Sequence, residues 1–344
     1  MKKIIILGGG FAGALAARKL ENDFEVTLID TKDYFEFTPS VLRTIVEPEH
    51  VAQIQVLHRQ YLHRAKIIKE EVKKITPTAV KLKSASLPFD YLILCSGSTY
   101  NTPIKEKNMV ITSRAEELRE YAERLKEAQT VLIIGGGLVG VELAAEIILT
   151  YPSKSLTLVH AKSELMERNP TKARQYARKF LEQKGVAFIF NERVVSYDKK
   201  GYSTDKGNTL KADLAFLCTG IKPNYEYMEK YCSPSLNERQ NICVQGSLQV
   251  QGYQHIFAAG DITNVMEEKT AQNAEKQAEL VIKNIFHLEK KEPPEEYHSK
   301  PRVMVISLGK WDGLLVYTNF VLTGIIPGIL KRVIEWKTMR RYRK

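Results

Sequence analysis

Short apolar runs that end in glycine turns punctuate the chain and predict buried parallel strands. Residues 4–7 and 131–134 consist of isoleucine, valine and leucine, the composition of a strand covered on both faces. Each run leads into a glycine turn. The segments after these turns, residues 14–20 and 141–149, have the composition of helices. The chain therefore contains the pattern of strand, glycine turn and helix twice.

Each glycine turn is followed by the same series of expected elements. A second strand is expected at residues 24–29 and again at 156–160, and hairpin-like alternation follows both. Buried strands then end in Ser96-Gly97 in the first series and in Thr219-Gly220 in the second. Because the whole layout repeats, this internal duplication indicates two related α/β units more strongly than either glycine turn alone.

The residues of the first turn suit a phosphate group. Gly8, Gly10 and Gly13 fill a G-x-G-x-x-G pattern, and residues 135–140 repeat it. The first glycine allows the tight turn, the second lets a pyrophosphate approach the backbone, and the third lets the helix pack close to the strand. Asp30, at the end of the second strand, can accept hydrogen bonds from a ribose. A glycine turn without a ligand is the alternative, but strand, helix and acid together indicate nucleotide binding.

A late strand indicates that the first unit is discontinuous. The apolar run at residues 256–259 ends in Gly260-Asp261 and lies outside the second unit, so its natural place is the last parallel strand of the first sheet. The expected fold class is α/β, with two Rossmann-like dinucleotide-binding domains, the second inserted in the first, and a short C-terminal strand-and-amphipathic-helix region. The expected limits are residues 1–111 with 250–290, residues 112–249, and residues 291–344.

Aromatic residues and a Thr-Pro pair follow Asp30. Phe35, Phe37 and Thr38-Pro39 suit a loop that closes over a ring system. The alternative is a helix that starts at the proline, with the aromatic side chains in the core. The sequence leaves both interpretations open.

The C-terminal segment combines apolar and basic residues. From residue 320 to residue 344 there are seven basic residues and one acid, Glu335. Helical spacing places on one side the residues Ile325, Ile326, Ile329, Leu330, Val333, Ile334 and Trp336. Such a helix suits an anionic lipid interface. The alternative is a helix packed on the body of the protein, with a solvated basic tail.

Composition narrows the remaining classes. The chain has 344 residues, enough for two or three domains, and its net charge of +11 suits nucleic acid, an acidic membrane surface or an anionic substrate. The four cysteines lack zinc or redox-disulfide spacing, so Cys95 and Cys218 are expected to be small core residues. The first apolar run is needed by the fold, so no signal peptide is expected, and no run is long enough to span a membrane.

These motifs together resemble the two-dinucleotide-binding-domain flavoprotein superfamily, over residues 2–290. Within it, the chain looks like the type II NADH:quinone oxidoreductases and the ferroptosis-suppressor branch of apoptosis-inducing-factor-like proteins. Three features carry this likeness: Phe37-Thr38-Pro39, the AQNAEKQ run at residues 271–277, and the tail from GKWDG at 309–313 to WKTMR at 336–340.

The resemblance implies FAD in the first domain and NADH or NADPH as substrate in the second. The residues expected to hold FAD are Gly8, Gly10, Phe11, Ala12, Gly13, Asp30, Thr38, Pro39, Val72, Ser96, Gly97, Gly260 and Asp261. Those expected to hold NAD(P)H are Gly135, Gly137, Leu138, Val139, Gly140, Glu142, His160, Thr219 and Gly220. His160 stands where an acid usually selects NADH, and Lys162 follows it, which leaves tolerance of a 2′-phosphate open.

The implied activity is FAD-dependent, non-proton-pumping NAD(P)H:quinone oxidoreduction. Since a redox cysteine pair is not expected, the acceptor should meet the flavin directly. The resemblance places Glu142 near the nicotinamide, although a carboxylate that stabilises a helix N-terminus is an equal alternative. Gln272 and Gln277 are candidates to line the quinone site.

The expected location is the cytoplasmic face of a membrane, bound peripherally through the C-terminal helix. Two other interpretations remain: a reductase for a soluble acceptor such as a ferredoxin, and a redox sensor whose basic tail binds lipid or nucleic acid. Neither a metal site nor a nucleic-acid partner is expected, and a homodimer is left open.

Overall fold

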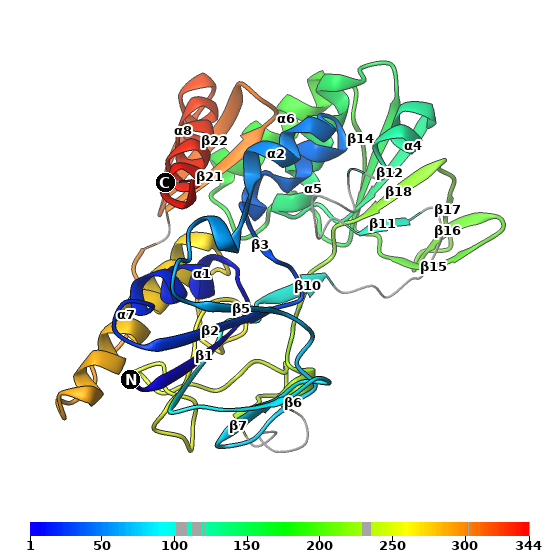
Figure 1. The fold of residues 1–344 in the computed structure, drawn as a ribbon. Coiled ribbons are helices and arrows are strands. Elements are labelled where there is room, and N and C mark those ends of the chain that lie inside the picture. The colour runs from blue at the N-terminus through cyan, green and yellow to red at the C-terminus, as the bar shows by residue number, and fades with distance from the viewer. Residues whose placement is uncertain (101–108, 112–118, 120, 229–234, 302, 344) are drawn as a thin grey trace.

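The computed structural model describes residues 1–343 apart from 101–108, 112–118, 120, 229–234 and 302. Two parallel sheets dominate this part of the chain (Figure 1). Each sheet has five strands, and the expected α/β architecture with Rossmann-like sheets is confirmed.

The first sheet has the order β20-β9-β1-β2-β5, and all of its neighbouring strands are parallel. The strands are β1 (Lys3–Leu7), β2 (Glu25–Asp30), β5 (Lys66–Lys69), β9 (Tyr91–Leu94) and β20 (Ile256–Ala258). Helix α1 (Phe11–Leu20) follows β1 and packs along α7 (Ala271–Glu289), near the end of the chain's first unit. The late strand β20 therefore returns to the first sheet, as its apolar run predicts.

The second sheet repeats this arrangement with the order β11-β18-β12-β13-β14, again with parallel neighbours. Its strands are β11 (Met109–Ile111), β12 (Thr130–Ile134), β13 (Ser155–His160), β14 (Ala187–Phe190) and β18 (Leu214–Leu217). The helices described in this unit, outside residues 112–118 and 120, are α4 (Ala122–Glu127), α5 (Leu138–Thr150) and α6 (Thr171–Gln183). The backbone hydrogen bonds match across the two units, because Gly8 N–H donates to Ile29 and Gly135 N–H donates to Val159, both over 2.8 Å.

Each unit also carries a small antiparallel sheet. These sheets are β6 (Lys74–Ile75), β7 (Ala79–Lys81) and β8 (Ser86–Pro88) in the first unit, and β15 (Val194–Asp198), β16 (Gly201–Thr204) and β17 (Thr209–Leu210) in the second. After the two Ser/Thr-Gly strand ends, β10 (Ser98–Tyr100) and β19 (Ile221–Pro223) pair antiparallel with each other. The chain therefore crosses between the units on a two-stranded ribbon.

The sheets place the unit boundaries differently from the sequence. Strand β11 pairs with β18 of the second sheet, so residues 109–111 belong to the second unit and not to the first. At the other boundary, Met228, Ile242 and Val250 are buried in one cluster with Leu7 of the first sheet, together with η4 (Glu226–Met228). We therefore propose that the second unit spans about residues 109–223, because long-range packing and not local composition fixes these limits.

The structure of the segment after β2 distinguishes between the two interpretations of its aromatic residues. It contains β3 (Tyr34–Glu36), η1 (Thr38–Ile45), η2 (Pro48–His50), α2 (Val51–Ile54), β4 (Gln55–Leu57) and η3 (His58–Gln60). Pro39 lies in the first turn of η1, where its missing N–H costs nothing. Phe35 and Phe37 are buried. The segment therefore starts a helical turn at the proline with its aromatic residues in the core, as the alternative interpretation predicts, and the contact of Thr38 and Pro39 with a flavin ring stays a prediction.

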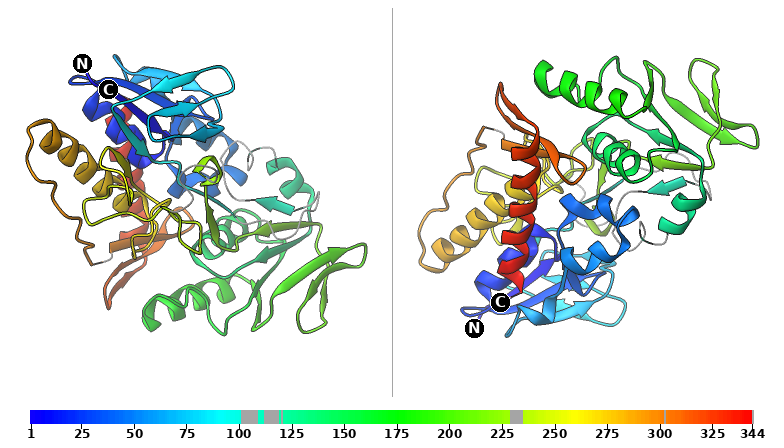
Figure 2. Two further views of the ribbon diagram at one scale, coloured as in Figure 1. Left: turned by 90° about the horizontal axis from the view of Figure 1, so that it is seen from below. Right: turned by 90° about the horizontal axis from the view of Figure 1, so that it is seen from above.

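The C-terminal region is an antiparallel sheet covered by a helix. Strands β21 (Val303–Leu308), β22 (Asp312–Tyr317) and β23 (Phe320–Thr323) precede α8 (Ile325–Tyr342). Residues 320–323 complete the sheet by pairing with β22, so the C-terminal helix begins only at Ile325. Helix α8 runs along the sheet and reaches the first unit at its C-terminal end (Figure 2). No helix among the described residues is long and apolar enough to cross a membrane.

Candidate functional site

The first glycine loop is shaped by close backbone contacts. Gly8 has φ +97°, and a side chain there would collide with the carbonyl of Cys95 on the neighbouring strand. A Cβ on Gly13 would collide with the carbonyl of Gly8, so helix and strand approach as the pattern requires. A Cβ built on Gly10 meets nothing within 4 Å. The loop thus faces open space where a pyrophosphate would lie. Phe11 and Ala12 form the first turn of α1 behind it.

Asp30 is bound to this loop through the backbone. Its carboxylate accepts hydrogen bonds from Gly9 N–H over 2.5 Å and from Lys32 N–H over 2.9 Å. His58 lies over Gly9 and is fully buried, with Nδ1 2.5 Å from the Tyr61 hydroxyl. Nε2 of His58 has no hydrogen-bond partner. An orphaned buried polar atom beside the loop fits a ligand that supplies the missing partner.

The second glycine loop has the same backbone geometry. Gly135 has φ +114° and lies against the carbonyl of Cys218, while Gly140 lies against the carbonyl of Gly135. A Cβ on Gly137 meets nothing within 4 Å. Leu138 and Val139 form the first turn of α5. This loop is therefore also open toward the place of a pyrophosphate.

The side chains beside the second loop differ from those beside the first. His160 Nδ1 accepts a hydrogen bond from Gly136 N–H over 3.1 Å, which is the place Asp30 takes in the first unit. Burial lowers the pKa of His160, and the nearby Glu167 opposes this only in part. Oγ1 of Thr219 is buried without a hydrogen-bond partner, and Gly220 has φ +63°. This orphaned hydroxyl fits a nucleotide at the second loop, as the orphaned nitrogen of His58 does at the first.

Four of the remaining residues expected at FAD, namely Ser96, Gly97, Gly260 and Asp261, follow the ends of β9 and β20. Ser96 Oγ is hydrogen-bonded to the Tyr227 hydroxyl over 2.7 Å, and Gly97 follows with φ +65°. Asp261 accepts a hydrogen bond from Ser98 Oγ over 2.8 Å, and burial raises its pKa. Val72 packs on the hydrophobic cluster beneath this sheet. The structure thus brings Asp261 to the strand end beside Ser96 and Gly97, as expected.

The two glutamines expected at a quinone lie in different surroundings. Gln277 is buried, and its carbonyl oxygen accepts the N–H of Gly260 over 2.8 Å while its amide donates to Glu267. It fastens the turn that carries Asp261. Gln272 is exposed on the first turn of α7. Thr38 is also exposed, one residue before Pro39.

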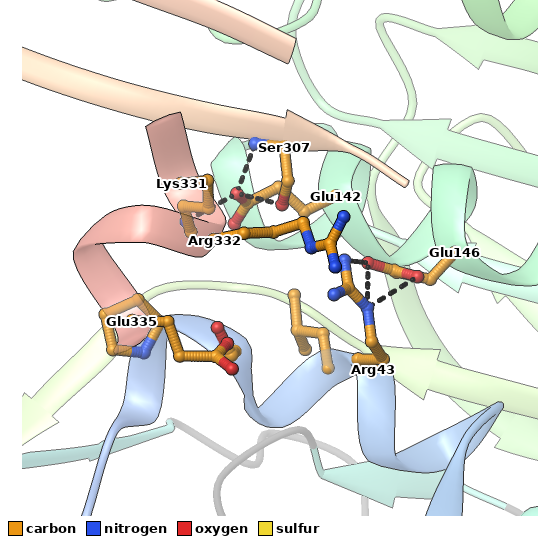
Figure 3. A pocket seen from close by; sticks show the side chains of 10 residues that line it. Arg43, Glu142, Glu146, Ser307, Lys331, Arg332 and Glu335 are labelled. Carbon is orange, nitrogen blue, oxygen red and sulfur yellow. Dashed lines mark hydrogen bonds and ion pairs between the residues drawn. The ribbon is translucent and has the colours of Figure 1, made fainter. Parts of the chain in front are cut away.

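A pocket lies where η1, α5, β21 and α8 meet (Figure 3). Glu142 is held there by Ser307, whose N–H and hydroxyl both donate over 2.8 Å, and by Lys331 Nζ at 3.1 Å. The carboxylate therefore faces the C-terminal sheet and helix. The cavity is small, about 10 Å³, because charged side chains fill most of the space.

Deeper in this pocket, Arg43 of η1 pairs with Glu146 of α5 over 2.8 Å, and both side chains are buried. Arg332 of α8 extends toward this pair (Figure 3). At the pocket's edge, Glu335 lies 3.3 Å from His50. Burial raises the pKa of Glu335, but hydrogen bonds from His50 and Ser40 outweigh it and leave this pKa lowered.

Sequence reasoning missed this cluster apart from Glu142 and Pro39. One signal was available, because Glu142 and Glu146 are four residues apart and so share a face of their helix. The partners Arg43, Ser307 and Lys331 had no local signal, since each comes from a different part of the chain.

The cysteines and metal-binding residue types form no further centre in the part of the chain that is described. Cys95 and Cys218 are buried under the two glycine loops and form no disulfide. Burial raises the pKa of the Cys95 thiol to about 12, so this thiol is unreactive at neutral pH. Among the described residues, no group of three or more histidine, cysteine, aspartate or glutamate side chains could hold a metal ion.

Comparison with known proteins gives consistent relatives. The family model described as pyridine nucleotide-disulphide oxidoreductase matches residues 2–278. Apoptosis-inducing factor homolog A of Dictyostelium discoideum is 33% identical, over 96% of this chain and 88% of the relative. Ferroptosis suppressor protein 1 of Homo sapiens is 28% identical, over 98% of this chain and 96% of the relative.

Solved structures share the fold at low identity. The sulfide:quinone oxidoreductase of Aquifex aeolicus superposes with a TM-score of 0.88 and 19% identity, covering 100% of this chain and 92% of the other. NDH2 of Plasmodium falciparum in complex with NADH gives a TM-score of 0.84 and 16% identity, covering 99% and 96%.

The family match and the two open glycine loops agree on the class of protein. The chain is an oxidoreductase of the flavin- and NAD(P)H-dependent type. Its relatives support the resemblance to the apoptosis-inducing-factor-like and ferroptosis-suppressor branch. The chain belongs to the pyridine nucleotide-disulphide oxidoreductase family.

Proposed function

We propose that this protein is a non-proton-pumping NAD(P)H:quinone oxidoreductase that works at the cytoplasmic face of a membrane. NAD(P)H gives up a hydride, and a membrane quinone takes up the two electrons and the proton of that hydride, together with one proton from solvent, to become the quinol. FAD, when bound, supplies the two-electron redox chemistry that links the two reactions. The protein's own groups bind the two nucleotides, keep water out and orient the reactants.

The observation that carries this proposal is the outer face of α8. Six large apolar side chains of this helix are exposed, namely Ile325, Ile326, Ile329, Val333, Ile334 and Trp336. The inner face of the helix packs on the body through other residues, among them Pro327, Met339 and Tyr342. An apolar stripe of this size on the exposed surface of a protein indicates a binding surface.

Charge and neighbouring side chains favour a lipid surface as the partner. Trp311 and Phe320 are exposed on the sheet beside α8 and extend the apolar surface. Arg332 lies over the Trp311 ring at 4.4 Å and Arg340 over the Trp336 ring at 5.2 Å. Aromatic rings flanked by cations suit the boundary between lipid headgroups and acyl chains. The same helix lines the pocket at Glu142, so it connects the apolar outer surface with the residue that the resemblance places near the nicotinamide.

The residues carry distinct roles in this proposal. Glu142 orients the nicotinamide side of the reaction, with its carboxylate fixed by Ser307 and Lys331. Gln272 contacts the quinone from the exposed first turn of α7. Gln277 supports that site indirectly, because its amide holds the Gly260 turn.

The membrane part of the proposal is tested with the double variant Ile326→Ser and Ile329→Ser in FAD-loaded protein. Each isoleucine that inserts into lipid contributes about 0.8 kcal/mol of binding free energy per buried CH₂ group. Replacing both with serine should therefore weaken vesicle binding by roughly tenfold or more. Turnover with a long-chain quinone in anionic vesicles should fall in parallel, while turnover with a water-soluble quinone stays at the parent level. Val195→Ser, which removes an exposed valine from β15 in the second unit, is the matched control and should change neither value.

Equal vesicle binding by parent and double variant would contradict the membrane surface. If neither quinone is reduced although NADH reduces the flavin, the acceptor is a soluble protein.

A further inference from the structure

The equivalent backbone N–H groups of the two glycine loops are hydrogen-bonded to different side chains. In the first unit, the N–H of the middle glycine, Gly9, donates to the carboxylate of Asp30. In the second unit, Gly136 N–H donates to Nδ1 of His160 over 3.1 Å. A carboxylate has further lone pairs left for ribose hydroxyls, whereas the imidazole has only its other nitrogen. The second unit therefore lacks an acceptor at the strand end.

The hydrogen bond to Nδ1 fixes the tautomer of His160. A nitrogen that accepts cannot carry the proton, so the neutral ring has its proton on Nε2. This Nε2 lies 3.5 Å from a carboxylate oxygen of Glu167, without the geometry of a hydrogen bond. The His160 side chain is 11% exposed and that of Glu167 is 43% exposed. The imidazole thus has a hydrogen-bond donor at Nε2, and the carboxylate near it belongs to the more exposed Glu167.

The backbone holds Glu167 in this position. The preceding residue, Met166, donates its N–H to the carbonyl of Gly136 over 2.9 Å and has φ +48°. The side chain of Leu165 packs directly over Gly136. The segment after β13 therefore folds back onto the glycine loop and carries Glu167 with it.

Two other charged residues of this segment, Glu164 and Arg168, are paired with residues outside it. Glu164 pairs with Arg174 of α6, and Arg168 lies 4.0 Å from Glu268. Lys162 is exposed two residues after β13, and its charge also acts on His160. Its positive charge would attract a 2′-phosphate. It would therefore oppose the effect of the Glu167 carboxylate on the nucleotide preference.

We propose that Glu167 is the specificity-determining acid of the second nucleotide site, and that it makes the enzyme prefer NADH to NADPH. Its carboxylate accepts a hydrogen bond from the adenosine ribose, while Nε2–H of His160 donates to the same sugar. A 2′-phosphate at this position would face the carboxylate, and the repulsion between like charges would weaken the binding of NADPH. This inference rests on the proposed role of the second glycine motif as the NAD(P)H site.

The test compares the rate constant for flavin reduction by NADH and by NADPH in FAD-loaded protein, without any quinone. Dissociation constants of NAD⁺ and NADP⁺ are measured in parallel by titration. The parent should favour the nucleotides without the 2′-phosphate by roughly tenfold or more, and Glu167→Gln should reduce this preference by about tenfold through tighter NADPH binding. Glu164→Gln, which removes an acid from the same segment, is the control and should leave the preference unchanged.

Three results overturn the proposal: a parent that prefers NADPH, an unchanged preference in Glu167→Gln, or a preference that responds to Lys162→Gln and not to Glu167→Gln. The binding titrations keep the test decisive if the hydride step itself is slow. Absence of binding by all four nucleotides would instead remove the assignment of the second motif, and the inference with it.

Discussion

The two glycine units of this protein share a backbone and differ in the side chains around it. In both, a glycine with positive φ turns under the carbonyl of a buried cysteine, Cys95 or Cys218, and the second glycine of the pattern faces open space. In the first unit a carboxylate fastens the loop, and in the second an imidazole does. The backbone geometry that suits a pyrophosphate is thus common to both units. The side chains beside the loops, which would contact the rest of the nucleotide, differ between them.

The two nucleotide helices also differ in what covers them. Helix α1 packs along α7 and buries alanine and leucine side chains. Helix α5 presents Glu142 and Glu146 to charged partners from η1 and α8. The first nucleotide helix is therefore covered by apolar packing, whereas the second is joined by ion pairs to η1 and α8, which line the pocket at Glu142.

The largest expected effect comes from breaking the buried contact between the units. Arg43→Met leaves Glu146 as a buried, unpaired carboxylate, which should lower the free energy of unfolding by about 3–5 kcal/mol. Chemical denaturation followed by circular dichroism measures this change. Arg178→Met removes an exposed pair with Glu182 and should cost only about 0.3–0.5 kcal/mol.

A second substitution distinguishes lost pairing from lost volume in the same experiment. Adding Glu146→Leu to Arg43→Met removes the unpaired charge and should recover most of the loss. A double variant as unstable as the single one would mean that packing, and not charge, holds the units together.

The next effect separates the two loops by their ligands. Asp30→Ala removes the carboxylate that accepts hydrogen bonds from the backbone N–H groups of Gly9 and Lys32, so the loop should lose its fixed geometry and FAD affinity should fall by about tenfold. His160→Ala should leave the flavin content of the purified protein unchanged and weaken NADH binding. The ratio of flavin to protein absorbance measures the first quantity and nucleotide titration the second. Loss of flavin from His160→Ala would contradict the separation of the two sites.

The smallest effect depends on pH and on His58, the residue that covers the first loop. Burial lowers the pKa of His58 to about 4 from its ordinary 6.5, and Asp30 opposes this only in part. Between these two values the unfolded chain binds a proton that the folded chain does not, so stability falls as the pH decreases through this window. From pH 7 to pH 5.5 the contribution of this group is a loss of about 1 kcal/mol.

Denaturant midpoints measured across this range should show the loss in the parent and a smaller slope in His58→Gln. Identical slopes in the two proteins would assign the acid sensitivity to other groups, such as His160, whose pKa is also lowered by burial.

The sequence predicted the two sheets because their signals are local. Apolar runs, the spacing of glycines and the Ser/Thr-Gly strand ends each lie within a few residues, and the duplication allowed one unit to support the interpretation of the other. The same reasoning failed at residues 109–111, where the pairing of β11 with the distant strand β18 overrides local composition.

The C-terminal helix illustrates the limit of a periodic pattern. Helical spacing correctly grouped the apolar residues of α8, but it could not tell which side faces the protein. The structure turns most of that group outward and buries Tyr342 instead, with its ring 4.2 Å from Phe35 and 4.8 Å from Tyr61. The end of the tail is therefore anchored in the first unit rather than solvated.

By itself the sequence determined two nucleotide-binding units, an insertion of one in the other, and a basic apolar helix at the end. The tertiary structure alone decided that Arg43 meets Glu146 from 103 positions away, that His58 lies over Gly9, and that Glu167 stands beside His160. The physical reason is the separation along the sequence of the residues that interact. Backbone conformation follows from neighbours along the chain, whereas an ion pair, an orphaned imidazole or a displaced acid exists only once distant segments have packed together.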